Sequence, residues 1–197
     1  MFKYDDWIKP SERIVKYFSN VFDIVNHKTE LELKLLFQDK VTAENVGKRV
    51  NRLSAVYGTR ISLSDQSLIT DYIINDDIVA KATAGEADVV NKLAFNEASG
   101  YDRCLSFASK FCSFCNPNSY PIYDSLVLEA LLRLNNEYKF DSVFSVQEKN
   151  HIKFNYDYDR FCCIIHNFRY YKEFNLTNCT LREIDKFLWI AGKGFED

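Results

Sequence analysis

The sequence is poor in the residues that make tight turns, with 3 prolines and 6 glycines among 197 residues. A β-sandwich or a β-barrel joins many short strands through such turns, so this composition argues against both folds. Hydrophobic residues make up 47% of the chain, and the formal net charge is only −3. These values exclude a largely disordered protein and allow a domain with a substantial core.

The sequence also lacks long apolar runs. No stretch approaches the ~18 apolar residues that indicate a membrane-spanning helix. Residues 1–10 carry charged side chains and no apolar h-region, which argues against a secretory signal peptide. The six cysteines are unevenly spaced and two of them are adjacent, unlike the disulfide framework of a secreted domain. We therefore expect a cytoplasmic protein with reduced cysteines and no membrane contact.

Motifs for the common cofactors are missing as well. The sequence contains no Walker loop, no Gly-x-Gly-x-x-Gly and no His-Glu-x-x-His. Cys112 and Cys115 have the spacing of metal ligands, and Cys162 with His166 would add two more. However, Cys112 and Cys115 fall on an apolar stripe, where packing is the commoner role of a thiol. We predict no metal and no cofactor.

Apolar residues recur with the period of an α-helix along nearly the whole chain. One such stripe consists of Ile14, Val15, Phe18, Val21, Phe22 and Val25. A short second helix is predicted over 31–37, and a third begins at the N-cap Thr42 and ends at Gly58. Thr180 and Glu183 form a capping box, which marks the start of the last helix.

These patterns predict one all-α domain over 1–197, with about eight to ten helices. No internal repeat, linker or low-complexity segment divides the chain. Residues 139–155 are the least helical part, and we expect an irregular segment or a small hairpin there.

A polar face lies opposite the apolar stripe of the helix predicted over 104–115. Ser106, Ser109, Lys110 and Ser113 follow one another at helical spacing. Small hydroxyl groups beside a lysine allow a ligand backbone to approach, and Ser106 and Lys110 have the spacing of a nucleophile and its base. The commoner origin of such a face is exposure to solvent.

The segment 120–125, with sequence YPIYDS, is a second candidate site. Asp124 precedes a predicted helix, where a carboxylate accepts hydrogen bonds from free backbone N–H groups and complements the helix dipole. That structural role is the commoner one. In an active site, the carboxylate would act as an acid or base or would stabilise positive charge. Tyr120, Tyr123 and Ser125 would then contact the substrate.

A basic face is predicted on the helix that begins after Thr42. Lys48, Arg49 and Arg52 are expected on its outer side, where they would contact phosphate groups. Basic side chains also lie along apolar surfaces for packing alone, and this is the commoner case. The net charge of −3 counts against tight, non-specific binding of nucleic acid.

Residues 100–127, GYDRCLSFASKFCSFCNPNSYPIYDSLV, resemble the core of the helix–hairpin–helix DNA glycosylase superfamily. In that family, a helix with small residues is followed by a loop with proline, and an aspartate opens the next helix. The resemblance implies a glycosylase-like core at about 42–137, with Asp124 as the catalytic aspartate. The lysine of bifunctional members would fall near Ser106, whereas Lys110 lies one turn later. This implies a monofunctional or inactive relative.

Two further segments, 53–61 and 184–192, look like signatures of a bacterial family of uncharacterised proteins. Three functions are compatible with the sequence. The first is a DNA glycosylase that removes a modified, flipped base. The second is a non-catalytic protein that binds nucleic acid or a protein partner on the same scaffold. The third is a binder of a small molecule or nucleotide in a cleft between helices.

The glycosylase hypothesis assigns roles to ten residues. Asp124 and Lys110 would be catalytic, and the substrate would contact Ser106, Ser109, Tyr120, Tyr123, Ser125, Lys48, Arg49 and Arg52. For the small-molecule hypothesis, the cleft would be lined by Tyr120, Tyr123 and Lys110. No feature of the sequence predicts an oligomeric state.

Overall fold

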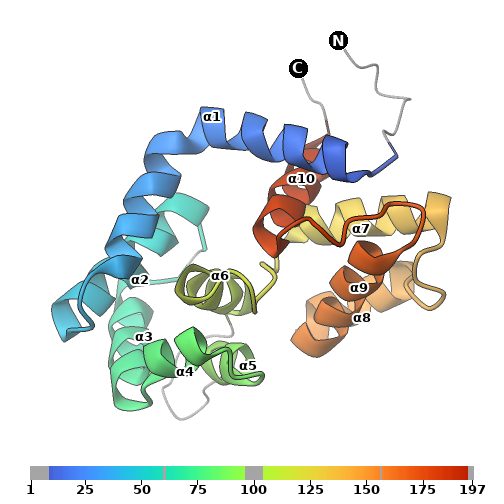
Figure 1. The fold of residues 1–197 in the computed structure, drawn as a ribbon. Coiled ribbons are helices and arrows are strands. Elements are labelled where there is room, and N and C mark those ends of the chain that lie inside the picture. Colours follow the sequence, from blue (N-terminus) through green and yellow to red (C-terminus); the bar gives the residue numbers. More distant parts are fainter. Residues whose placement is uncertain (1–8, 60, 96–103, 156, 195–197) are drawn as a thin grey trace. The chain divides into compact units, whose positions relative to one another are not determined.

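The computed structural model describes residues 9–59, 61–95, 104–155 and 157–194. These residues contain ten helices and no strand (Figure 1), so the predicted all-α class is confirmed. The helices are α1 (Glu12–Gln38), α2 (Ala43–Tyr57), α3 (Leu63–Asn75), α4 (Ile78–Ala84), α5 (Val89–Ala94), α6 (Leu105–Cys115), α7 (Ser125–Tyr138), α8 (Val146–Asn155), α9 (Tyr158–Tyr170) and α10 (Leu181–Lys193).

Contacts between the helices divide the chain into two compact units. Unit 1 comprises Met1–Val25 and Tyr123–Asp197, and unit 2 comprises Asn26–Ile122. The first half of α1 therefore belongs to unit 1 and its second half to unit 2. The single domain expected over 1–197 stays a prediction.

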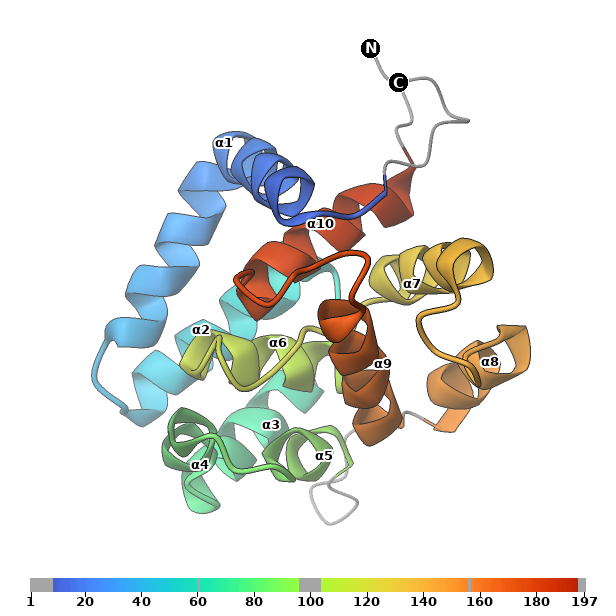
Figure 2. The same cartoon turned by 45° about the vertical axis from the view of Figure 1, so that its right-hand side comes forward.

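In unit 1, α7 and α10 pack closely against each other (Figures 1 and 2). Gly192 of α10 lies so near α7 that a Cβ added to it would come within 2.2 Å of the Leu126 carbonyl oxygen. The predicted capping box begins α10, because Thr180 and Glu183 each accept a hydrogen bond from the other's backbone N–H. The end of α9 joins an aromatic cluster formed by Phe140, Phe168, Tyr171 and Phe174.

Unit 2 is built around α6, which contacts α2, α4 and α5 (Figure 2). Phe107 and Phe111 of α6 are completely buried. The predicted limits of α2 are confirmed. The Thr42 side chain accepts a hydrogen bond from Asn45 N at the start, and Gly58 ends the helix in the left-handed conformation, with φ 56°.

The helix predicted separately over 31–37 is the second half of α1, which is continuous to Gln38. The predicted break was wrong because residues 26–30 contain neither glycine nor proline. A polar stretch without these residues does not stop a helix, since most polar side chains have only a small helix penalty.

Residues 139–155 are irregular in their first part, which is the first of the two predicted alternatives, and they contain no hairpin. Lys139 ends α7 in the left-handed conformation, a loop follows, and α8 occupies the rest. Periodicity did not indicate α8 because its apolar residues do not share one buried face. Ile152 is fully buried, whereas Val146 at the start of the helix is 51% exposed.

Within the described residues, no helix has the length and apolar character needed to cross a membrane. The six cysteines are free. The described part of the chain also holds no cluster of histidine, cysteine, aspartate and glutamate side chains suited to a metal ion. Burial raises the pKa of Cys115 to about 12, so this thiol stays protonated at neutral pH and serves packing.

Candidate functional site

Asp124 stands at the start of α7, directly after the buried residues Pro121, Ile122 and Tyr123. Its backbone is extended, with φ −145° and ψ 145°, and its Oδ1 accepts a hydrogen bond from Leu126 N at 2.9 Å. The residue itself is half-buried. Asp124 is therefore an N-cap that keeps part of its surface exposed.

Lys110 and its neighbouring hydroxyl groups form a buried polar cluster on α6. The Lys110 side chain donates a hydrogen bond from Nζ to Ser106 Oγ at 2.7 Å, and Nζ lies 5.2 Å from the centre of the Tyr57 ring. Ser109 is completely buried, and Lys110 is 2% exposed. The expectation of a solvent-exposed face was wrong, because α6 is enclosed by other helices on this side as well as on its apolar side.

The predicted catalytic pair is divided between the two units. Asp124 belongs to unit 1 and Lys110 belongs to unit 2. Each group therefore has to be judged by the chemistry of its own neighbours: Asp124 caps a helix, and Lys110 is bound to Ser106.

Arg49 lies in the interior of unit 2 and is completely buried, so its predicted place on the outer side of α2 was wrong. Its Nε donates to Leu36 O at 3.1 Å, and Nη2 donates to Asp39 O. These carbonyl groups lie at the end of α1, where no further turn of helix supplies donors. Arg49 therefore caps the end of α1 and is not available to a phosphate group.

Lys48 and Arg52 remain on the surface, but each is already paired with a carboxylate. Lys48 Nζ lies 2.6 Å from Glu44 Oε1, and Arg52 Nη2 lies 2.6 Å from Glu32 Oε2. The hydrogen bond to Glu44 raises the pKa of Lys48. Two of the three predicted phosphate-binding cations are thus exposed, although their charges are balanced.

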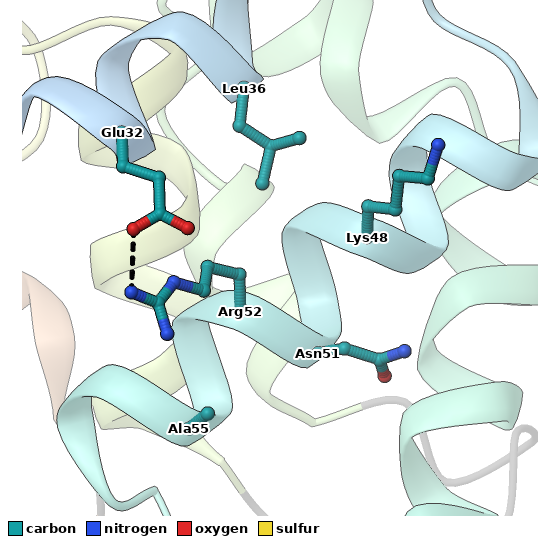
Figure 3. A pocket seen from close by; sticks show the side chains of 6 residues that line it. All are labelled: Glu32, Leu36, Lys48, Asn51, Arg52 and Ala55. Carbon is teal, nitrogen blue, oxygen red and sulfur yellow. Dashed lines mark hydrogen bonds and ion pairs between the residues drawn. The ribbon is translucent and has the colours of Figure 1, made fainter. Parts of the chain in front are cut away.

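An open groove of about 430 Å³ runs between the second half of α1 and α2 (Figure 3). Leu36 points into it from α1, and Arg52 reaches across it from α2 to Glu32. Its lining consists of Glu32, Leu36, Lys48, Asn51, Arg52 and Ala55. The groove therefore combines an apolar patch with side chains of both charges, which suits a protein surface better than a polyanion.

Of the remaining predicted contact residues, Tyr120 and Tyr123 are buried and held by structural contacts, whereas Ser125 is exposed. Tyr120 is 3% exposed and donates from its hydroxyl to Glu86 O at 2.8 Å, and burial raises its pKa. Tyr123 is 7% exposed, with its ring edge-on to Phe161. Ser125 is exposed at the first turn of α7. Tyr120 belongs to unit 2, whereas Tyr123 and Ser125 belong to unit 1.

Sequence reasoning missed a buried ionic network around Asp141 in unit 1. Arg160 donates to both carboxylate oxygens, at 3.0 and 2.9 Å, and Asn167 donates to Oδ2 at 3.0 Å. Burial alone would raise the pKa of Asp141, but the hydrogen bonds from Arg160, Asn167 and the backbone of Val143 and Phe144 lower it to about 2. Because its oxygens are engaged within the chain, Asp141 stabilises the loop after α7.

Comparison with known proteins gives a family and one relative. The model of the HI_0787_N family, an N-terminal domain, matches residues 12–119. An uncharacterised protein of Haemophilus influenzae is 29% identical over 164 residues, which are 81% of this chain and 72% of that protein. No solved structure matches the chain. The family match covers α1 to α6 and ends before Asp124.

Proposed function

The chain belongs to the HI_0787_N family of N-terminal domains, and we propose that it is a DNA-glycosylase-like protein that acts on a modified base in DNA. The observation that carries this proposal is the placement of Asp124. A helix with small residues, α6, is followed by a proline-containing segment, and Asp124 then opens α7. This is the order of elements implied by the resemblance of residues 100–127.

The proposed reaction is hydrolysis of the bond between the base and C1′ of the sugar. Water attacks C1′, the glycosidic C–N bond breaks, and the base leaves with the bonding electrons. Asp124 accepts the proton from water or stabilises the positive charge that develops on the sugar. The base has to leave the stack before this bond becomes accessible.

The surroundings of Lys110 support a reaction that does not use a lysine nucleophile. A covalent step on C1′ would require an accessible, neutral amine. The Lys110 amine is instead enclosed and hydrogen-bonded to Ser106. We therefore propose release of the base without cleavage of the DNA strand, and we assign Lys110 a structural role in unit 2.

Asp124→Asn is the variant that tests this proposal, because asparagine caps a helix about as well as aspartate but cannot accept the proton. The assay measures base release from oligonucleotides that each contain one uracil, one alkylated purine or one oxidised guanine. We expect base release by the wild type and a loss of at least about 100-fold in the variant.

The matched control is Asp157→Asn, because Asp157 also caps a helix in unit 1 and accepts a hydrogen bond from Arg160 N. This variant should keep wild-type base release, and both variants should keep their free energy of unfolding to within about 0.5 kcal/mol. Undiminished release by Asp124→Asn, or no release by the wild type from any substrate, would contradict the proposal.

A second candidate function is a non-catalytic interaction protein. It is favoured by the groove in unit 2, where the ion pairs of Lys48 and Arg52 leave no excess positive charge beside Leu36. A phosphate group that bound Lys48 or Arg52 would first have to displace the paired carboxylate. The loss of that ion pair would offset the free energy gained from the phosphate contact. This candidate predicts that no variant releases a base, although the protein is folded.

A further inference from the structure

A serine and a lysine of α6 form a hydrogen-bonded pair in which only the serine keeps part of its surface open to solvent. Lys110 Nζ donates to Ser106 Oγ, one helical turn earlier, at 2.7 Å. Lys110 is 2% exposed, whereas Ser106 is half-buried. A reachable hydroxyl group beside an enclosed amine matches the arrangement of a serine nucleophile and its general base.

Groups from two further helices hold the lysine in place. In α2, which contacts α6 (Figure 2), the centre of the Tyr57 ring lies 5.2 Å from Lys110 Nζ. The Tyr57 hydroxyl donates to Glu30 Oε1 of α1 at 3.3 Å, and Glu30 is 4% exposed. A nucleophile is activated by a base that a third group orients. Ser106, Lys110 and Tyr57 supply these three parts, and all of them belong to unit 2.

The backbone at the start of α6 provides hydrogen-bond donors next to Ser106. The first N–H groups of a helix have no partner within that helix. In α2 and α7, the Thr42 and Asp124 side chains accept from such a group, but Cys104, the N-cap of α6 in the described part of the chain, makes no such bond. Its thiol donates to Leu93 O at 3.7 Å instead. The N–H groups around Ser106 are therefore placed to stabilise a negative charge that develops on a nearby oxygen.

We propose that Ser106 and Lys110 are the nucleophile and the general base of a second activity, the hydrolysis of small carboxylic esters. A small acyl group is favoured because Leu105 and Phe107, on either side of Ser106, are 1% and 0% exposed. In addition to its structural role, Lys110 acts on Ser106 and forms no bond to the substrate. This activity goes beyond base release, because it uses neither Asp124 nor DNA.

The proposed reaction has two steps and consumes only water. In its uncharged form, the Lys110 amine accepts the hydroxyl proton of Ser106 while Oγ bonds to the carbonyl carbon. The ester C–O bond then breaks, and Lys110 returns the proton to the departing alcohol. In the second step, water attacks the acyl carbon after giving a proton to Lys110. The bond to Oγ breaks, the carboxylic acid leaves, and Ser106 regains its proton from Lys110.

Reaction of the full chain with a fluorophosphonate tests this proposal, because the reagent forms a stable bond to an activated serine. We expect one label, located on Ser106 by peptide mass spectrometry, and hydrolysis of p-nitrophenyl acetate above the rate in buffer. Ser106→Ala should abolish both signals and keep the wild-type circular dichroism spectrum, because alanine is a good helix former. An unlabelled wild type, or a label that persists in Ser106→Ala, would overturn the proposal.

Two substitutions of Lys110 test the assignment of the base. Lys110→Met removes the amine from a side chain of similar length, and Lys110→Arg keeps a positive charge that cannot accept a proton. Each should lower labelling and ester hydrolysis about 100-fold. The control is Ser67→Ala, which removes an exposed hydroxyl of α3 and should keep both signals. Wild-type rates in a folded Lys110→Met or Lys110→Arg variant would overturn the role of Lys110.

Discussion

A single glycine sets how closely two helices of unit 1 approach each other. The atoms nearest to a Cβ added at Gly192 all belong to the Leu126 backbone, at 2.2, 2.6 and 3.0 Å. Backbone atoms cannot rotate away as the end of a side chain can. Because Leu126 also donates the capping hydrogen bond to Asp124, Gly192 supports the start of α7.

Gly192→Ala should therefore destabilise the protein although alanine is the better helix former. Separation of α7 from α10 is expected to cost about 2 kcal/mol or more, which exceeds the ~1 kcal/mol gained in helix propensity. Urea unfolding followed by circular dichroism measures the difference.

The control for this prediction is Gly47→Ala in α2, where the nearest atom to an added Cβ is Thr70 Cγ2 at 3.8 Å. This distance is an ordinary contact, so the substitution should be neutral or stabilise the protein by up to about 1 kcal/mol. Equal stability of Gly192→Ala and the wild type would show that the two helices move apart easily.

At the scale of elements, Asp141 joins three helices of unit 1 through one loop. Asn135 of α7 donates to the Asp141 carbonyl at 2.8 Å, and Arg160 of α9 connects Asp141 with Glu148 of α8. The Asp141 side chain is 3% exposed. The loop thus has a defined structure without being part of a helix, and its ionic core makes it sensitive to acid.

Acid should destabilise the fold of unit 1 because it protonates the Asp141 carboxylate. The pKa of this carboxyl is about 2 in the folded chain, below its ordinary value of 3.8. The carboxylate therefore stabilises the fold above about pH 3.8, and this contribution is lost as the pH falls through about 2. From the difference in pKa, the loss is about 2 kcal/mol.

The measurement is the free energy of unfolding of the wild type and of Asp141→Asn from neutral pH to about pH 2. The free energy of unfolding of the wild type should exceed that of Asp141→Asn at neutral pH, and this difference should shrink as the pH falls below about 3.8. Asp71→Asn, which removes an exposed carboxylate of α3, should follow the wild type throughout. A constant difference between wild type and Asp141→Asn would contradict the assignment.

At the scale of the whole molecule, charge would limit binding to DNA if the proposed function is correct. The formal net charge is −3, Arg49 is buried, and Lys48 and Arg52 are paired with carboxylates. In a glycosylase, these three side chains would therefore contribute little to the release of counterions from DNA. Recognition would then depend on the flipped base more than on the phosphates.

Any DNA binding should therefore depend weakly on salt. If Lys48 and Arg52 are the phosphate contacts, the logarithm of the binding constant should fall against the logarithm of salt with a slope of about −2. Fluorescence anisotropy with a labelled duplex measures this slope. Lys48→Ala combined with Arg52→Ala should flatten it, whereas a wild-type slope near −5 would indicate a basic face elsewhere.

Local sequence determined the fold class and several helix ends. Helical periodicity predicted the all-α class, and Thr42, Gly58 and the Thr180–Glu183 box marked ends that the structure confirms. The physical reason is that capping and periodicity depend on residues within a few positions of each other. Asp124, Ser106 and Lys110 were chosen as candidates from the same local patterns. Ser106 and Lys110 lie on α6 and Asp124 lies at the start of α7, as predicted.

Only the tertiary structure decided which charged side chains are buried. Arg49 was expected on the surface but caps a helix 10 to 13 residues earlier in the chain. Lys110 was expected on a solvated face but is enclosed, and Asp141 finds Arg160 at a separation of 19 residues. These outcomes depend on how the helices pack against one another. Packing brings together residues that are far apart in the sequence, and such contacts produce no periodic pattern by which they could be predicted.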